Sequence, residues 1–394
     1  MSVRPLACRV LVVAAAAPVL AAAVVPANSV AAPITPAGIA GMLPVRGLLI
    51  DVAAISPRIA WAVGQTGLCQ TTTLITRWDG STWKVMRVPA AAHRGSLDGI
   101  AVLSVRNAWA VGTADTAGGG QRALVLRWNG TAWTKVRTAG GARGVSLAGV
   151  AAVSARDAWA VGSTGAGRTY TARWDGTAWT RVRSPSPGGE SLLTGVAATS
   201  ARNAWAVGGI LGRPGRALIM HWNGTAWARV PATGLPAGSF LERVAMTSPR
   251  AGWAVGTVGF DKTLIARWNG KTWQRVSSPD VAGQLTGVTA TSARNAWAVG
   301  VTPSLLVQCG ASGQGPLAPA VRLGARAGRF RSLIWHWNGT AWKQAMTPNL
   351  PGGSGLAGVT ATSADSAWAV GGAGNNLGPK SKALALRWNG SRWR

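Results

Sequence analysis

The chain has 394 residues, and its 40 lysines and arginines against 11 acids give a formal net charge of +29. One tyrosine and three histidines exclude a copper site built from two tyrosines and two histidines, and leave little for acid–base chemistry. The excess of positive charge suits a polyanion, but GC-rich coding also enriches arginine, alanine and glycine, so charge alone does not assign nucleic acid as the partner.

Residues 1–31 are predicted to be a cleavable signal peptide. Arg4 and Arg9 form a basic start, "VLVVAAAAPVLAAAVV" is an apolar core, and "NSVAAP" offers small residues around a cut after Ala31. The core has 16 residues, short of the roughly 20 that a spanning helix needs. We therefore expect a protein that is secreted or associated with the cell envelope, with no transmembrane anchor after processing.

Residues 46–394 contain seven copies of one repeat, and 32–45 form either a linker or a ring-closing segment. Each copy has one tryptophan in an "AWAVG" element, one before an Asn-Gly or Asp-Gly pair, and one five residues later. The first set is Trp61, Trp109, Trp159, Trp205, Trp253, Trp297 and Trp368; the second is Trp78, Trp128, Trp174, Trp222, Trp268, Trp337 and Trp388; the third is Trp83, Trp133, Trp179, Trp227, Trp273, Trp342 and Trp393. A period of 44–50 residues, with one enlarged spacing of 71, is typical of propellers and solenoids.

Four short strands can be recognised within each repeat. In the fourth copy they are "LLTGVAAT", "NAWAVGG", "ALIMHW" and "TAWARV", which are apolar or β-branched and show no helical periodicity. The pattern predicts an all-β protein, a seven-bladed β-propeller of four-stranded antiparallel blades. The last copy stops at "SRWR", so its fourth strand is either stunted or accompanied by residues near 34–45.

The stretch "HWNGTAW", residues 221–227, predicts a hairpin. Asn223–Gly224 suits a two-residue type I′ turn, which would place Trp222 opposite Thr225 and Trp227 diagonally on the same face. We interpret the paired indoles as packing between blades. The slot of His221, which holds arginine in five repeats, is expected on the other face, where cations stack on indoles.

At this point the chain resembles known repeat families. The layout "GVAATSARNAWAVGG…ALIMHWNGTAWARVP" resembles a kelch repeat. It is also similar to the Asp-box propellers of sialidases and photosystem-assembly factors, although "WDGSTW" lacks one residue of that box. The resemblance covers residues 46–394 and implies the propeller fold, but fold does not imply function.

A sialidase-like site would need a tyrosine nucleophile with a glutamate partner. Only Tyr170, Glu190 and Glu242 are available, and Tyr170 begins a third strand rather than lying on an inner one. No metal-ligand spacing is present. We therefore assign no catalytic residue, no metal and no cofactor.

Positions that break the repeat are the candidate binding residues. On the innermost strands, a slot that holds glycine in five repeats (Gly99, Gly149, Gly195, Gly287 and Gly358) carries Asp51 in repeat one and Arg243, next to Glu242, in repeat five. These side chains could pair across the channel or contact a polar ligand; ordinary variation at a solvated lining is the alternative. The long, variable connections all fall on one face of the disc, where function usually resides.

Two further features lie in these connections. The insertion around 302–332 carries Arg322, Arg326, Arg329 and Arg331, which form either an anionic-polymer contact or a solvated basic loop. Cys69 and Cys309 would pair as a disulfide in an exported protein, the alternative being two free or differently paired thiols.

Together these features predict an exported, monomeric, non-catalytic propeller that binds a glycan, a cell-envelope polymer or a protein through its variable loop face. One alternative is a glycan-directed hydrolase or lyase with a site near Asp51, Glu242 and Arg243. Another is a polyanion or nucleic-acid binder, which is possible but not favoured.

Overall fold

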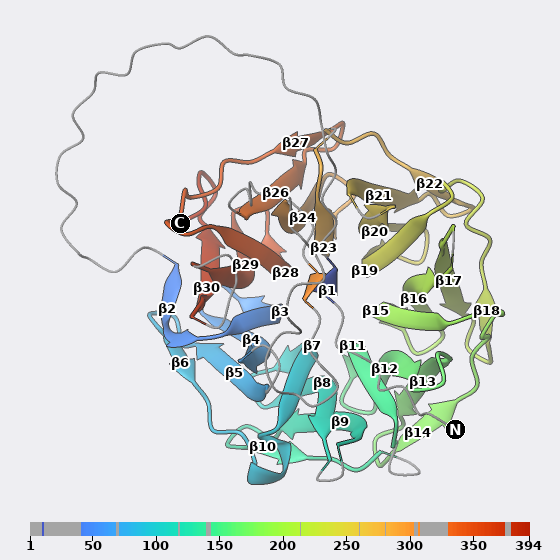
Figure 1. The fold of residues 1–394 in the computed structure, drawn as a ribbon, viewed down its shortest axis with the longest axis horizontal. Helices are drawn as coiled ribbons and strands as arrows, with labels where there is room; N and C mark the ends of the chain where they lie inside the picture. The colour runs from blue at the N-terminus through green and yellow to red at the C-terminus, as the bar shows by residue number, and fades with distance from the viewer. Residues whose placement is uncertain are drawn as a thin grey trace.

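The computed structural model describes residues 10–11, 41–67, 71–116, 119–138, 143–212, 214–259, 261–279, 281–302, 306–307, 330–374 and 380–394. In these residues seven four-stranded antiparallel sheets surround a common axis (Figure 1). The predicted seven-bladed propeller is confirmed. A separate two-stranded sheet pairs β1 (Val10–Leu11) with β25 (Leu306–Val307), and η1 (Ala90–Ala92) is a single 3-10 turn. No helix in the described residues is long and apolar enough to cross a membrane.

Six blades use their strands in chain order from the axis outward, and in the seventh β2 lies outside the last three strands of the chain. The innermost strands are β3 (Leu48–Ser56), β7 (Gly95–Ser104), β11 (Val145–Ser154), β15 (Ser191–Ser200), β19 (Ser239–Ser248), β23 (Gln284–Ser292) and β28 (Ser354–Ser363). The second strands are β4 (Ile59–Thr66), β8 (Asn107–Asp115), β12 (Asp157–Thr164), β16 (Asn203–Ile210), β20 (Ala251–Val258), β24 (Asn295–Thr302) and β29 (Ser366–Ala373). We number the blades one to seven in this order.

The outer half of each blade is the predicted tryptophan hairpin. The third strands are β5 (Thr72–Trp78), β9 (Gln121–Trp128), β13 (Thr169–Trp174), β17 (Arg216–Trp222), β21 (Lys262–Trp268), β26 (Arg331–Trp337) and β30 (Lys382–Trp388). The fourth strands of blades one to six are β6 (Trp83–Val85), β10 (Trp133–Lys135), β14 (Trp179–Val182), β18 (Trp227–Arg229), β22 (Trp273–Arg275) and β27 (Trp342–Gln344).

Blade seven is completed by both ends of the propeller. β2 (Met42–Arg46) pairs with the outer edge of β30, where Met42 lies opposite Leu384. The C-terminus covers the rest of that edge, because Arg387 and Arg394 exchange two backbone hydrogen bonds. The fourth strand of this blade is therefore assembled from two segments that are far apart in the sequence, which joins the first repeat to the last.

Indole triads fill the walls between neighbouring blades. Trp205 of blade four is 2% exposed, and its ring centroid lies 4.6 Å from Trp268 and 5.6 Å from Trp273 of blade five. The same contacts recur around the ring, and Trp368 of blade seven closes it against Trp78 and Trp83 of blade one. These contacts confirm that the paired tryptophans are packing residues.

The predicted register of the hairpin was wrong. Trp222 lies directly opposite Trp227, so the loop has four residues instead of two. Asn223 Oδ1 accepts hydrogen bonds from the Thr225 and Ala226 backbone N–H groups and from the Thr225 hydroxyl, at 2.8–2.9 Å. Asn-Gly serves both turn types, because only Gly224, with φ +102°, needs a positive φ here, and the side-chain oxygen of Asn223 selects the longer loop.

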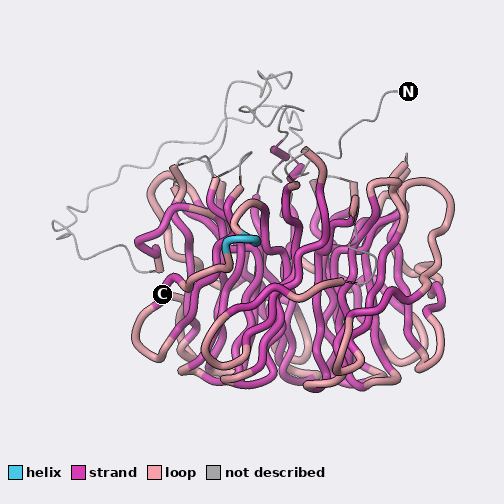
Figure 2. Tube along the Cα trace, turned by 90° about the horizontal axis from the view of Figure 1, so that it is seen from below, coloured by secondary structure: helices cyan, strands magenta, loops and turns pink. Residues whose placement is uncertain are grey.

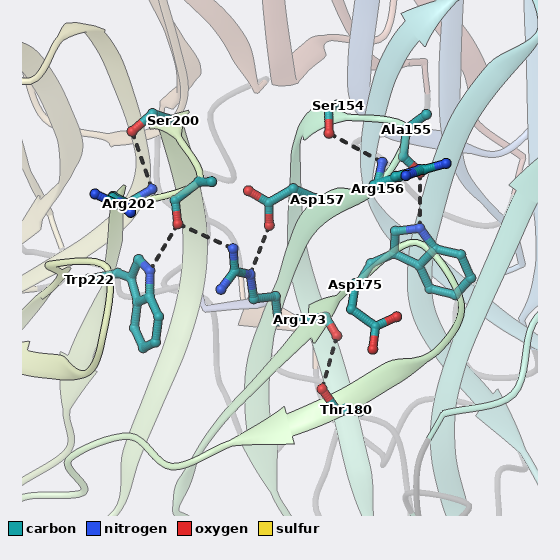
Figure 3. A network of polar contacts seen from close by, with 12 residues as sticks. Ser154, Ala155, Arg156, Asp157, Arg173, Asp175, Thr180, Ser200, Arg202 and Trp222 are labelled. Atoms are coloured by element: carbon teal, nitrogen blue, oxygen red, sulfur yellow. Dashed lines mark hydrogen bonds and ion pairs between the residues drawn. The ribbon is translucent and has the colours of Figure 1, made fainter.

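The residue immediately before the third-strand tryptophan stacks on indoles, as expected. Arg173 lies 5.5 Å from the ring centroid of Trp159 and donates from Nε to Asp157 at 2.8 Å (Figure 3). Its Nη2 also donates to the Ala201 carbonyl of the next blade. His336 takes the same slot in blade six and stacks on Trp297 at 4.1 Å.

The two faces of the disc differ in their connections. The turns between first and second strands and between third and fourth strands are short and lie on one face, the lower one in Figure 2. The connections between second and third strands, and between blades, differ in length from blade to blade and emerge on the opposite face. We call this opposite face the loop face.

Candidate functional site

Every innermost strand carries a bulge that turns two consecutive residues toward the channel. The register between Leu241 and Arg243 shifts by one residue against β20, which makes Glu242 the extra residue. A bulge bends its strand and re-aims its side chains. The bulged residues of blades one to seven are Ile50, Asp98, Ala148, Thr194, Glu242, Thr286 and Ala357.

The position after the bulge is crowded, which explains its glycines. A Cβ added to Gly99 would lie 3.0 Å from the Cα of Gly149, and one added to Gly195 would lie 3.0 Å from the Cα of Arg243. Neighbouring inner strands therefore approach closest at this level. A side chain is accommodated only in blades one and five, as Asp51 and Arg243.

Arg243 crosses the channel and binds backbone oxygens of three blades. Its Nη1 donates to Thr194 O at 2.8 Å and to Glu242 O at 3.1 Å, and its Nη2 donates to Asp98 O at 2.9 Å. These contacts join blade five to blades four and two. The Arg243 side chain thus occupies the channel, and both of its terminal guanidinium nitrogens donate to backbone carbonyl oxygens of the protein.

Asp51 also faces the channel, but it is held by backbone groups rather than by Arg243. Its Oδ1 accepts from Val52 N at 2.9 Å and its Oδ2 from Ile100 N of blade two at 3.0 Å. Ion pairs in the described residues are Lys84–Asp79 and Arg173–Asp157, so the direct pair envisaged between Asp51 and Arg243 is absent among them. Burial raises the pKa of Asp51, while the charge of Arg243 and the two backbone hydrogen bonds lower it.

Two more carboxyl groups share this environment. Burial raises the pKa of Asp98 to about 6, against a Ser96 hydrogen bond and the charge of Arg243. Burial likewise raises the pKa of Glu242 to about 6, against the charge of Arg243 and a 2.9 Å hydrogen bond from Gln284. The channel therefore holds one fixed positive charge among three partly buried carboxyl groups.

Sequence reasoning identified Asp51, Glu242 and Arg243 but missed Asp98. Asp98 and Glu242 occupy the same bulged position, one residue before the slot. The sequence does distinguish Asp98, because the residue at this position is acidic only in blades two and five and is isoleucine, alanine or threonine in the other five. No cluster of three metal-ligating side chains is found in the described part of the chain.

The remaining predicted residues fall elsewhere. Arg331 begins β26, the third strand of blade six, where it is exposed and pairs in the sheet with Thr302. Arg322, Arg326 and Arg329 lie outside the described residues, as do Cys69 and Cys309.

A groove opens on the loop face of blade four. Its volume is about 860 Å³, and its walls are the connection from β16 to β17 and the segment that links blade four to blade five. Leu211, Leu235 and Pro236 supply apolar surface, and Arg216 and Arg229 supply charge. A second groove of about 700 Å³ lies beside blade three and is lined by Arg168, Arg181 and Arg183 among others.

Comparison with known proteins supports the fold. No family model matches the sequence, and a search of curated proteins gives no significant match. Solved structures that are similar include YCF48 bound to D1 peptide, with 16% identity, a TM-score of 0.54, and coverage of 88% of this chain and 93% of that chain. The BP39L lectin from Burkholderia pseudomallei has 12% identity, a TM-score of 0.53, and coverage of 89% and 98%.

A polysaccharide lyase of a family named PL25, an ulvan lyase bound to -[GlcA(1-4)Rha3S]-, is similar at 8% identity and a TM-score of 0.54, with coverage of 90% and 96%. Identities this low establish a shared fold and nothing about the ligand.

Proposed function

We propose that this chain is an exported, non-catalytic binding propeller that takes a glycan, a cell-envelope polymer or a protein segment on its loop face. The observation that carries the proposal is the 860 Å³ groove over blade four, formed by connections that differ from blade to blade. Its volume falls within the range of ligand sites, and its lining combines apolar walls with a few charged groups.

The central channel is less suited to a ligand than the groove. Arg243 fills it and donates to three carbonyl oxygens, so a ligand there would have to break bonds that hold blades together. The groove needs no such rearrangement. Similar folds with a bound peptide, a lectin activity or a bound glycan fragment are consistent with binding on a propeller.

The test is a binding screen over glycans, envelope polymers, peptides and DNA at low and physiological salt. Leu211→Gln in the groove should weaken the ligand that is found by about tenfold, since it removes apolar contact area. Val105→Gln is the matched control, because Val105 is 42% exposed in a turn on the opposite face. If Leu211→Gln, Val105→Gln and the unaltered protein bound the ligand with equal affinity, the groove would not be its binding site.

A catalytic alternative rests on Asp98 and Glu242, because carboxyl groups with a pKa near 6 are suited to acid–base work. It predicts turnover of a glycan panel that Glu242→Gln abolishes, with folding unchanged. Retained turnover in that variant would remove Glu242 from consideration.

Export is part of the proposal and has its own test. Cleavage after Ala31 predicts that the mature protein begins at Ala32, which mass spectrometry of protein collected outside the cell would show. In the same measurement, addition of reductant should raise the mass by about two hydrogens if Cys69 and Cys309 pair.

A further inference from the structure

Four consecutive blades carry a pair of basic residues at matching positions. One member stands six residues before the third-strand tryptophan, and the other follows the fourth-strand tryptophan by two residues. The pairs of blades two to five are Arg122 with Lys135, Arg168 with Arg181, Arg216 with Arg229, and Lys262 with Arg275.

The sheet register places the two members of each pair on one face of the blade. Arg229 lies opposite Met220, and Met220 is four residues after Arg216 on the same strand. Residues separated by two or four positions along a strand share a face, so Arg216 and Arg229 project to the same side. Arg275 lies opposite Ala266, four residues after Lys262, with the same result.

In blades three and four these pairs line the two grooves, the first on the loop face of blade four and the second beside blade three. Arg216 and Arg229 line the groove of about 860 Å³. Arg168 and Arg181 line the groove of about 700 Å³, together with Arg183 and the hydroxyl-bearing Ser184 and Ser186. The wall of the second groove is fixed in place, because Thr169 Oγ1 lies 3.0 Å from Ser184 Oγ and 2.9 Å from Pro185 O.

These pairs have no acidic partner within ion-pairing distance in the described part of the chain. The two ion pairs in the described residues involve none of these side chains. Glu190 packs against Gly167 next to Arg168 but makes no ion pair with it within 4 Å. In blade two, burial and the charge of Arg122 lower the pKa of Lys135, and the Lys135 ammonium donates to the Ala91 carbonyl oxygen at 3.2 Å. An anion bound between two cations of such a pair offsets their mutual repulsion.

The other blades show that this pattern is not required by the fold. Blade one has Thr72 and Val85 at the two positions, and blade six has Arg331 and Gln344. Their strands pair with the same register as the rest. The four basic pairs are therefore a run on one side of the ring rather than a structural element of every blade.

We propose that the grooves of blades three and four, flanked by the pairs of blades two and five, bind an anionic polysaccharide through its carboxylate or sulfate groups. This inference rests on the proposed function and names its ligand class. A polymer is favoured over a small anion, because the pairs repeat once per blade along an arc and a polymer repeats its charges. A polysaccharide is favoured over single-stranded nucleic acid, because single-strand binding uses exposed aromatic rings for stacking. The exposed large apolar side chains of the described residues are Val85, Val105 and Met346.

The experiment compares two variants with the same change in charge. One carries glutamine in place of Arg168, Arg181, Arg216 and Arg229. The control carries glutamine in place of Arg106, Arg156, Arg202 and Arg250, which are exposed in turns on the opposite face. The probes are dextran sulfate, polygalacturonate, uncharged dextran and double-stranded DNA, at low and physiological salt, with thermal unfolding to show that both variants fold.

The proposal expects dextran sulfate or polygalacturonate to bind and uncharged dextran not to bind. The groove variant should lose at least about tenfold in affinity and the control at most about twofold, because four contacted charges are removed in one case and none in the other. Equal losses in both variants, no binding of either anionic polysaccharide, or tighter binding of DNA would overturn it. If the four-arginine variant keeps its ligand while Leu211→Gln loses it, the loop-face groove stands and only the anionic ligand class fails.

Discussion

The walls between blades and the inner strands around the channel come from the same seven repeats but behave differently. In the walls, the second-strand indole lies 4.6–5.0 Å from the third-strand indole of the next blade at all seven junctions. Around the channel, the bulged residue varies between blades and the glycine after it is replaced in two of them, and the polar contacts of Arg243, Asp51 and Glu242 each occur once. Positions that repeat build the ring, and positions that vary are free to acquire contacts of their own.

The largest expected effect is in a wall. Trp205→Ala removes a side chain that is 2% exposed and lies against Trp268, Trp273 and His221. We expect the free energy of unfolding to fall by about 3–5 kcal/mol, measured by urea unfolding. Met346→Ala is the control, because that side chain is 92% exposed and should change stability by less than about 0.5 kcal/mol. If the indole contacts between blades did not stabilise the fold, Trp205→Ala and Met346→Ala would lower the free energy of unfolding by equally small amounts.

The channel should instead show a dependence on pH. The folded pKa of Asp98 and Glu242 is about 6, above the ordinary values of 3.8 and 4.5, so the folded protein binds more protons than the unfolded chain between about pH 4 and 6. The stabilisation from these groups is complete below pH 4 and is lost as the pH rises to about 6. Asp98→Asn with Glu242→Gln should remove this dependence and raise stability at pH 7 by up to about 2 kcal/mol per site.

The pH dependence of the double variant must be compared with that of the unaltered protein, because histidines also change their protonation state in this pH range. Burial lowers the pKa of His221 and His336, which makes stability fall as the pH drops below about 6.5 and opposes the carboxyl contribution. The difference in unfolding free energy between double variant and unaltered protein cancels the histidines. A difference that stays constant from pH 4 to 7 would contradict the assignment of raised pKa values to the channel.

The smallest effect is expected in the repeated turn. Asn223→Ala removes the acceptor of three hydrogen bonds and should cost about 1 kcal/mol in thermal unfolding. Asn223→Asp should be nearly neutral, because Asp175 makes the same bonds in blade three. If the aspartate variant were as unstable as the alanine variant, the side-chain oxygen would not be what organises the loop.

Much of the fold could be read from particular residues. The tryptophans at fixed spacing, the "AWAVG" elements and the Asn-Gly pairs predicted four strands per repeat, seven blades and indole packing between them. These features are local or strictly periodic, so a linear pattern records them. The glycine slot on the inner strands also pointed correctly to a crowded channel, and its two exceptions pointed to Asp51 and Arg243.

Other features depended on contacts that a linear pattern does not record. Asn223–Gly224 fits two turn types, and the hydrogen bonds of the folded loop decide between them. Asp98 reaches the channel because a bulge shifts the alternation of its strand. Arg243 binds carbonyl oxygens of blades two and four, although Asp98 is 145 residues away in sequence.

The sequence by itself determined the repeat, the blade and the residues that pack between blades, because identical copies must bury identical faces against one another. Only the tertiary structure decided which side chains meet across the ring, how β2 and the C-terminus complete blade seven, and which cations share a groove. Ring closure is the physical reason, since it brings together residues from different blades that have no relation along the chain.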